Sequence, residues 1–358
     1  MPNCSPAVLV PPDLHYLPTG QYMGVHGKAN RLPRTGHTSL PPLFTDKKIG
    51  TKCDARWLVL MGRRLMNSSG SDVTIVMITH NRLAEVLHSL EHLSRLPERP
   101  KILVVDNGSG DGTAAAVGRQ FPRVKVLTLA ENLGAAGRTI GVAHASARYV
   151  AFCDDDTWWE PGSLSRAAHL FDVHPQVAVM TGRILVGPEN REDPICGELE
   201  RSPLPDEPDL PGYPLLGFLA GASVIRRSAF LEVGGFESRF FIGGEEELLA
   251  LDLATRGWSL RYVPELVVHH HPSPNCNAAS RRWHLLRNAL WSAWLRRPLR
   301  SAFRETVRLI RTSPHDRTAL LGFSHALAGL PWVLRQRRVV PPWVEHRLSL
   351  LDSRRRVS

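Results

Sequence analysis

Residues 73–105 read VTIVMITHNRLAEVLHSLEHLSRLPERPKILVV, and this stretch decides the fold class. The apolar, β-branched run at 73–78 predicts a buried strand, and apolar residues recur at helical spacing from Arg82 to Arg95. Residues 101–105 predict a second buried strand. Buried strands that alternate with helices are typical of parallel pairing with helices on both faces of the sheet.

The same alternation continues along the chain. It predicts helices over 112–120 and 135–145 and strands over 124–129 and 149–152. A Pro- and acid-rich exposed loop is expected from Gly187 to Pro214. The expected fold is α/β, a mixed and mostly parallel sheet between helices, with a Rossmann-like half that binds its ligand beyond the carboxyl ends of the strands.

The composition is that of an ordinary globular protein, with 358 residues of which 43% are hydrophobic and 22% charged, which excludes a fibre or a disordered linker. The five cysteines are scattered without a C-x-x-C pair, which favours a reducing, cytosolic compartment. No apolar run approaches the roughly 18 residues of a membrane span, and the order of a secretory signal is missing. We therefore expect a cytoplasmic protein that does not cross a bilayer.

Three regions are predicted. Residues 1–70 are rich in Pro and Gly without any period, which indicates an irregular or disordered segment. Residues 71–275 form the α/β domain, and residues 276–358 form a basic, amphipathic helical region. Of the net charge of +10, Arg281–Ser358 carry +13, from 17 arginines and four acidic residues, so the rest of the chain carries −3. Such a tail suggests an anionic partner, a nucleic acid or a lipid surface.

The stretch after Pro298 has two faces at helical spacing. Leu299, Phe303 and Ile310 lie on an apolar face, and arginines line up beside it: Arg300, Arg304, Arg308 and Arg311. Basic amphipathic helices of this kind lie in membrane interfaces, so residues 298–358 are a candidate for membrane-surface contact at the inner face of the plasma membrane. Packing of these faces on the α/β domain is the alternative.

Polar clusters follow four consecutive predicted strands. They are THNR at 79–82, DNGSGDGT at 106–113, NLGAAGR at 132–138 and DDD at 154–156. Each cluster alone is compatible with an ordinary turn. As a set they are unusual, because each cluster follows a predicted strand. The carboxyl ends of parallel strands meet at one edge of a sheet, so the four clusters are expected to lie together there.

With these motifs the chain resembles the inverting glycosyltransferase family 2, over about Val73 to His271. The resemblance implies a GT-A fold and transfer of a hexosyl or deoxyhexosyl group from a UDP- or dTDP-sugar. The acceptor would be a hydroxyl of a glycan or a lipid-linked saccharide, attacked in a single displacement with inversion. Bacterial surface-polysaccharide assembly would fit this activity.

The resemblance implies that residues of the first two clusters bind the pyrimidine base of the donor. These residues are Thr79, Asn81, Arg82 and Asp106. A carboxylate can accept the imide N–H of uracil or thymine, which adenine does not have. Capping of a turn is the alternative role for Asp106. Gly134 would let the backbone approach the donor, and Arg138 would face phosphate or sugar. A solvated surface charge is the alternative for Arg138.

Three adjacent carboxylates repel one another unless a cation neutralises them, and Mg²⁺ or Mn²⁺ prefer oxygen ligands shared with phosphates. The resemblance places the ribose contact on Asp154 or Asp155 and the metal on Asp156. It also places a metal- or diphosphate-binding histidine after the strand at 263–268, for which His270 is the first choice and His271 the second. A merely polar strand end is the alternative for these histidines.

The resemblance also places an acidic pair, which holds the general base, at the start of the predicted helix at 245–256. By position the base is Glu246 and its partner is Glu245, with a register uncertainty of one residue that includes Glu247. The alternative is three acids that complement a helix N-terminus.

Two other functions were weighed. A nucleotidyltransferase would need a Gly-rich phosphate loop directly after the first strand, and THNR contains no glycine. A nucleic-acid-binding protein would explain the basic, Trp-rich tail, but acids in the cleft would repel phosphate. We therefore expect no nucleic-acid partner.

Overall fold

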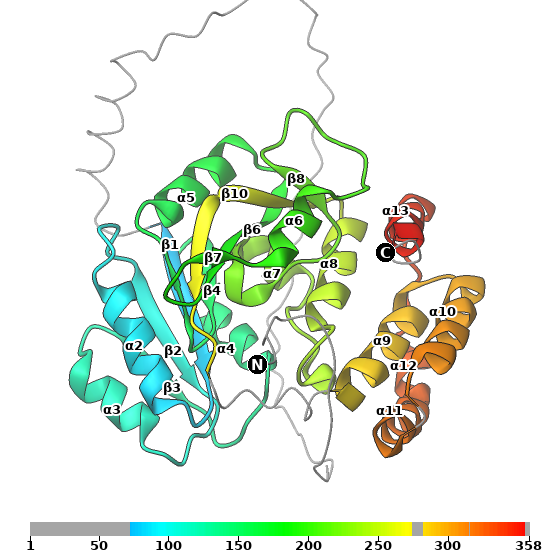
Figure 1. Cartoon of the computed structure of the whole chain (residues 1–358), viewed down its shortest axis with the longest axis horizontal. Coiled ribbons are helices and arrows are strands. Elements are labelled where there is room, and N and C mark those ends of the chain that lie inside the picture. Colours follow the sequence, from blue (N-terminus) through cyan, green and yellow to red (C-terminus); the bar gives the residue numbers. More distant parts are fainter. Residues whose placement is uncertain (1–71, 274–281, 315, 355–358) are drawn as a thin grey trace, which may run out of the picture. The chain divides into compact units, whose positions relative to one another are not determined.

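The computed structural model describes residues 72–273, 282–314 and 316–354 (Figure 1). The predicted irregular segment 1–70 and the predicted boundary at 275–276 lie outside these residues. The described strands form one sheet in the order β3-β2-β1-β4-β9-β6-β10-β5, with β7 on β6 and β8 on β10. Their bounds are β1 Val73–Thr79, β2 Lys101–Asp106, β3 Lys125–Thr128, β4 Tyr149–Cys153, β5 Thr157–Trp159, β6 Val177–Val186, β7 Arg191–Glu192, β8 Tyr213–Leu215, β9 Ser223–Arg226 and β10 Ser259–His270.

The sheet has a parallel half and a mixed half. Strand β1 pairs in parallel with β2 and β4, and β2 with β3, which confirms the predicted strand–helix alternation. In the other half β9 is antiparallel to β4 and β6, while β5 and β8 are antiparallel to β10. The strands β1 and β2 pair in register so that Thr79 lies opposite Asp106, which brings the first two polar clusters together.

Helices cover the sheet, and further helices follow it. Helix α4 packs on β1 and β2, and α5 packs on β10. The helices of the α/β domain are α2 Leu83–Ser94, α3 Thr113–Gln120, α4 Ala136–His144, α5 Ser163–Val173, α6 Pro194–Glu200, α7 Arg227–Glu232 and α8 Glu245–Thr255, with short 3₁₀ turns at Ala220–Ala222 and Ser238–Phe240.

The expectation of an exposed, irregular loop from Gly187 to Pro214 is wrong in part. This stretch contains α6, on which Cys196 is fully buried, and it leads into β8. Asp193 caps α6 by accepting a hydrogen bond from the Ile195 amide at 3.0 Å, and Pro194 occupies the first turn. A helix this short has too few turns for a periodic pattern to be recognised in the sequence.

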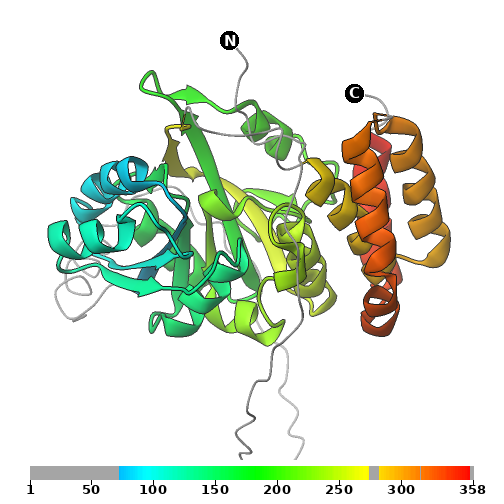
Figure 2. The ribbon, with the colours of Figure 1, turned by 90° about the horizontal axis from the view of Figure 1, so that it is seen from below.

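The C-terminal region is helical, as predicted. Its helices are α9 Arg282–Arg296, α10 Leu299–Thr312, α11 Arg317–Ala328, α12 Leu330–Gln336 and α13 Pro342–Arg354. Helix α9 packs on α8, and α10, α11 and α12 pack on α9 (Figure 2). In α10, Leu299 and Phe303 are 62% and 64% exposed, so these two side chains do not pack on the α/β domain. Within the described residues, none of the helices is both long and apolar enough to span a bilayer.

Two helical glycines provide a test of the packing between α4 and the sheet. A Cβ at Gly141 of α4 would lie 2.4 Å from Val76 Cγ1 of β1, whereas a Cβ at Gly118 of α3 would meet nothing within 4 Å. We expect Gly141→Ala to lower the free energy of unfolding by about 1–3 kcal/mol through overpacking. Gly118→Ala should raise it by about 0.5–1 kcal/mol, because alanine is the better helix former. Chemical denaturation measures both values, and a stabilising Gly141→Ala would contradict the close packing.

Candidate active site

A buried hydrogen-bond acceptor that has no hydrogen-bond partner among the described residues lies at the ends of β1 and β2. Asp106 is fully buried, and its Oδ1 accepts a hydrogen bond from the Ser109 amide at 3.2 Å. Among the described residues, Asp106 Oδ2 has no hydrogen-bond partner. Buried polar atoms in native proteins are almost always paired, so this oxygen is free to take a donor from a ligand. The Ser109 contact also gives Asp106 the turn-capping role that we considered as an alternative.

Asn81 joins the first two polar clusters. Its backbone has a φ of 53°. Its amide donates to Ser109 Oγ at 2.9 Å, and its Oδ1 accepts from the Gly110 amide at 2.8 Å. The neighbouring Arg82 places Nη1 3.3 Å from Glu85 Oε1. Asn81 therefore holds the loop beside Asp106, and the base contacts expected of Asn81 and Arg82 stay predictions.

The three aspartates after β4 have three different environments. Asp154 forms an ion pair with Arg138. Burial, together with the charges of Asp156 and Asp154, raises the pKa of Asp155 to about 8. Asp156 Oδ2 lies 3.7 Å from His270 Nε2. The repulsion within the triple Asp is thus relieved by one arginine, one histidine and a carboxyl group that resists ionisation.

Arg138, in the first turn of α4, is the central cation of the site. It is only 6% exposed, which excludes the alternative of a solvated surface charge, and its contact with phosphate or sugar stays a prediction. Burial by itself lowers the pKa of Arg138, but the charge of Asp154, and after it those of Glu246 and Glu245, raises it above its usual value. The carboxylates at the end of β4 and at the start of α8 therefore converge on one guanidinium.

The three glutamates at the start of α8 differ in burial and in the groups whose pKa their charges change. Glu245 is 3% exposed, and burial and the charge of Glu246 raise its pKa well above its usual value. Glu246 is less buried, its Oε1 accepts from the Ala220 amide at 3.4 Å, and burial raises its pKa as well. The charge of Glu247 acts instead on Arg308 of α10. Glu245 and Glu246 are thus the two of the three whose charges act on Arg138.

Gly134 has a structural role beside this cluster. Its φ is 57°, and a Cβ here would lie 2.1 Å from the carbonyl oxygen of Phe241. The amide of Ala135 donates to the same carbonyl at 2.7 Å, and Phe241 itself has a φ of 62°. The loop before α4 is therefore pressed against the loop that leads into α8. A contact of Gly134 with a donor stays a prediction.

Sequence reasoning missed the residues that hold this loop from the C-terminal side. Asn288 of α9 is fully buried, and its Nδ2 lies 2.9, 3.2 and 2.5 Å from the carbonyl oxygens of Phe240, Ile242 and Gly243. Beside it, Arg287 Nη2 donates to the carbonyl oxygen of Phe240 at 2.9 Å. The signal in the sequence was weak: an Arg-Asn pair inside a helix otherwise rich in Leu and Trp.

Two side chains of the site, Asp156 and His270, could act as ligands of a metal ion. Within the residues that the structure describes, no group of three His, Cys, Asp or Glu side chains is arranged to hold a metal ion. Asp156 and His270 offer an oxygen and a nitrogen that face each other, and His271 lies instead against the ring of Trp158, with a centroid distance of 4.6 Å. Burial alone lowers the pKa of His270, but Asp156 raises it above its usual value. This pair fits a Mg²⁺ or Mn²⁺ ion that takes its other ligands from a diphosphate and water.

Residues 74–234 match the family described as Glycosyl transferase family 2. Two proteins of Mycobacterium tuberculosis are similar in sequence. An N-acetylglucosaminyl-diphospho-decaprenol L-rhamnosyltransferase is 28% identical over 277 residues, which are 66% of this chain and 90% of that protein. A pre-mycofactocin glycosyltransferase is 32% identical over 213 residues, which are 57% of this chain and 43% of that protein.

The fold is similar to that of a solved structure, GalNAc-T7 with UDP, GalNAc and Mn²⁺. The TM-score is 0.51 at 15% identity, covering 72% of this chain and 55% of that chain. At this identity the likeness shows the fold alone, a mixed α/β sheet of the GT-A type. Together with the family match it confirms the predicted fold class.

Removal of the central cation should destabilise the protein. Arg138→Gln leaves Asp154, Glu245 and Glu246 without a counter-charge. Because the Asp154 side chain is 43% exposed and partly screened by solvent, the loss of unfolding free energy should be about 1–3 kcal/mol, below that of a fully buried pair. The loss should shrink as the pH is lowered, because protonation of the carboxyl groups removes their repulsion. Urea denaturation at neutral and acidic pH measures both effects.

Arg166→Gln is the matched control, because Arg166 forms an exposed ion pair with Glu265 at 3.8 Å. It should change stability by no more than about 0.5 kcal/mol. Equal losses for the two variants would contradict the central role of Arg138.

Proposed function

Because residues 74–234 belong to glycosyl transferase family 2, the protein is a glycosyltransferase, and we propose that it uses a UDP- or dTDP-sugar donor. The transferred group is a hexosyl or deoxyhexosyl residue, and the acceptor is a hydroxyl of a lipid-linked saccharide or glycan. The observation that carries the proposal is the convergence of Asp154, Glu245 and Glu246 on the buried Arg138 at the strand ends. Sugar transfer is favoured over nucleotidyl transfer and nucleic-acid binding by the family match.

Asp106 supports a pyrimidine donor. Its unpaired Oδ2 is an acceptor that the imide N–H of uracil or thymine can satisfy. Since Asp106 is buried, the loop that Asn81 ties to Ser109 and Gly110 must open when the base binds. Thr79 lies opposite Asp106 in the register of β1 and β2, so it also borders the proposed base site.

The diphosphate of the donor belongs near Asp156 and His270. These two residues would hold a Mg²⁺ or Mn²⁺ ion, which when bound neutralises the charge of the departing diphosphate. The ribose hydroxyls are assigned to Asp154, which pairs with Arg138, or to Asp155, whose raised pKa of about 8 lets its protonated carboxyl donate a hydrogen bond.

Glu246 is the proposed general base. It is the more accessible of the two glutamates that face Arg138, and its raised pKa makes it a better proton acceptor than an ordinary glutamate. It removes the proton of the acceptor hydroxyl as the oxygen attacks the anomeric carbon, with inversion. Glu245 is buried beside it, and burial and the charge of Glu246 raise the pKa of Glu245 well above its usual value.

The acceptor is proposed to be lipid-linked. The similar mycobacterial rhamnosyltransferase is named for a diphospho-decaprenol acceptor, and it aligns over most of its length with this chain. A lipid-linked acceptor would place the enzyme at the cytoplasmic face of the membrane. The exposed Leu299 and Phe303 of α10, beside the basic residues of the same helix, are suited to contact with that surface.

The nucleotide specificity tests the base assignment. With Mn²⁺ present, UDP or dTDP should raise the melting temperature and ADP should not, because only the pyrimidines offer an imide donor to Asp106. Asp106→Asn should weaken the pyrimidine nucleotide by about 1–3 kcal/mol. Asp156→Asn should reduce the effect of Mn²⁺. Equal stabilisation by ADP and UDP would show that Asp106 does not read the base.

The role of Glu246 is tested by transfer kinetics. Glu246→Gln keeps the shape of the side chain but cannot accept a proton, so the transfer rate should fall by on the order of 10²-fold or more, with donor affinity little changed. Glu247→Gln is the matched control, because it changes the neighbouring glutamate of the same helix turn, and it should keep a rate near that of the wild type. The base lies elsewhere if Glu246→Gln transfers sugar normally.

The pH profile of the wild-type enzyme gives an independent check. The base must be ionised to act, and its pKa is raised from the usual 4.5, so kcat should fall with decreasing pH through a midpoint above that value. Glu247→Gln should leave this midpoint in place. A kcat that stays constant down to pH values below the usual glutamate pKa would contradict the assignment.

A further inference from the structure

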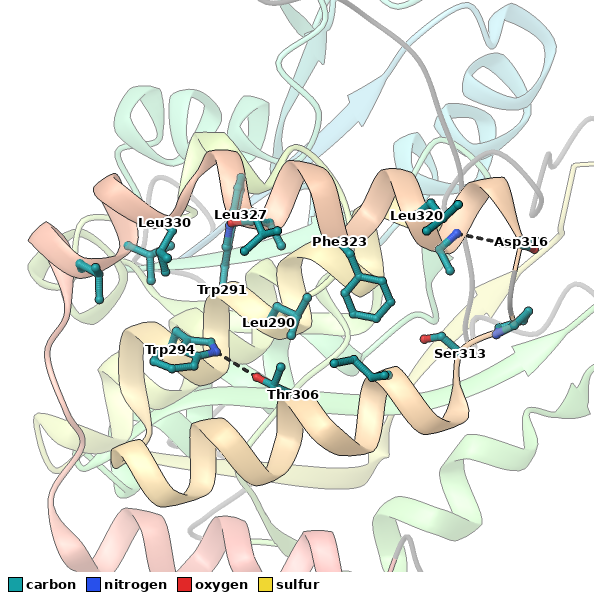
Figure 3. Close-up of a pocket in the computed structure, with 16 residues that line it drawn as sticks. Leu290, Trp291, Trp294, Thr306, Ser313, Asp316, Leu320, Phe323, Leu327 and Leu330 are labelled. Carbon is teal, nitrogen blue, oxygen red and sulfur yellow. Dashed lines mark hydrogen bonds between the residues drawn. The ribbon is translucent and has the colours of Figure 1, made fainter.

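The C-terminal helices enclose an apolar groove that the proposed chemistry does not use. Helices α10 and α11 both pack on α9 but make few contacts with each other, and the groove lies between them (Figure 3). Its volume is about 660 Å³, within the range of small-molecule sites. Leu290, Trp291 and Trp294 of α9 line it together with apolar residues of α10, α11 and α12, and the polar lining residues are Thr306, Ser313 and Asp316.

The rim of the groove is apolar and open to solvent. Leu320 and Leu327 of α11 are 70% and 69% exposed, Leu334 of α12 is 53% exposed, and Ile310 of α10 is 51% exposed. All four line the groove. Large apolar side chains left in water around an apolar cavity mark a site that is covered when a partner binds.

The helices that line this apolar site also carry positive charge outside its lining that is unpaired among the described residues. On the three helices that form its walls, five exposed arginines make no ion pair with any described residue: Arg300, Arg304, Arg311, Arg317 and Arg335. Arg311 and Arg317 lie close in the sequence to Ser313 and Asp316, which line one end of the groove (Figure 3), and Asp316 is already neutralised by an ion pair with Arg282. A lipid phosphate or diphosphate would fit such a surface. Its hydrocarbon chain would occupy the apolar groove, and its phosphate would pair with nearby arginines.

The same end of the groove is connected to the active-site loop. Arg282, which pairs with Asp316, begins α9, and Leu285 one turn later lies against Gly243, where a Cβ would be 2.4 Å from its Cδ2. From the floor of the groove, Trp291 packs on Phe240, with ring centroids 5.9 Å apart. Gly243 and Phe240 belong to the loop that leads into Glu245 and Glu246.

We infer that the groove between α10 and α11 binds the hydrocarbon chain of the lipid-linked acceptor, with its diphosphate at the Arg311 and Arg317 end. The inference rests on the proposed function, because it names the site for the lipid of that acceptor. Helix α9 contacts both the groove and the loop that precedes the proposed catalytic glutamates, so it connects the bound lipid with that loop. Leu299 and Phe303, which do not line the groove, are left for the membrane surface.

The test uses farnesyl diphosphate that carries a photoreactive group at the end of its chain. With the full-length protein we expect crosslinks in peptides of α9 to α12. Unlabelled farnesyl diphosphate should compete better than farnesol, and inorganic diphosphate should compete poorly, because chain and head both contribute. Leu320→Gln/Leu327→Gln should weaken labelling at least tenfold without loss of folding, since both side chains are largely exposed.

The matched control is Leu299→Gln/Phe303→Gln, which changes two equally exposed apolar residues of α10 outside the groove and should leave labelling unchanged. Three results would overturn the inference: labelling outside α9 to α12, equal labelling of both double variants, or competition by phosphatidylglycerol vesicles as strong as by farnesyl diphosphate. The last result would assign the groove to the bilayer surface. A dimer that dissociates in Leu320→Gln/Leu327→Gln, without labelling of the groove, would assign it to a second copy of the chain and would also overturn the inference.

Transfer assays separate the inference from the proposed function. If the wild type transfers sugar to a long-chain lipid diphosphate acceptor and the Leu320→Gln/Leu327→Gln variant does so with an unchanged KM, the groove inference fails and the proposed function stands. If the groove is labelled as expected but no sugar reaches any lipid acceptor, the proposed acceptor fails and the groove remains a lipid site. The expected result is a raised KM for the long-chain acceptor with unchanged hydrolysis of the donor.

Discussion

The buried guanidinium of Arg138 is the charge on which the active site depends. It lies in the first turn of α4, pairs with Asp154 at the end of β4, and faces Glu246 and Glu245 at the start of α8. Carboxylates that are held this close and out of water would otherwise protonate or separate. With the cation in place they stay together, and the pKa of Glu246 remains raised by burial, which suits a general base. In the proposed mechanism, binding of the sugar donor and removal of the acceptor proton therefore both depend on Arg138.

The loop from Phe240 to Gly244 positions the glutamates, and it is held from two sides. Phe241, Gly243 and Gly244 all have positive φ, which glycine adopts readily but which in Phe241 needs support from the surroundings. The loop before α4 supplies part of this support through the Ala135 amide, and α9 supplies the rest through Asn288. The C-terminal helices are thus part of the architecture of the active site. Binding at the groove above α9 would be transmitted to the glutamates through the same contacts.

Much of the fold could be predicted from the sequence because it depends on local pattern. The buried strands β1, β2 and β4 and the helices between them have clear periods, and parallel strands bring their carboxyl ends together, so Asp106 and Asp154 were expected at one edge. The short antiparallel strands β8 and β9 and the helix α6 have too few residues for a period, and their placement depends on distant pairing. The burial of Arg138 and the loop contacts of Asn288 depend on tertiary packing, which no local pattern of the sequence reveals. The roles of the individual site residues remain predictions.

A crystal structure of the protein with UDP or dTDP and Mn²⁺ would test the account most directly. The account predicts that the imide nitrogen of the base lies within hydrogen-bond distance of Asp106 Oδ2, after the loop of Asn81 has opened. It also predicts that the diphosphate lies at Asp156 and His270, with Arg138 still paired to Asp154. A nucleotide bound away from the ends of β1 and β4, or a base that does not contact Asp106, would contradict the account.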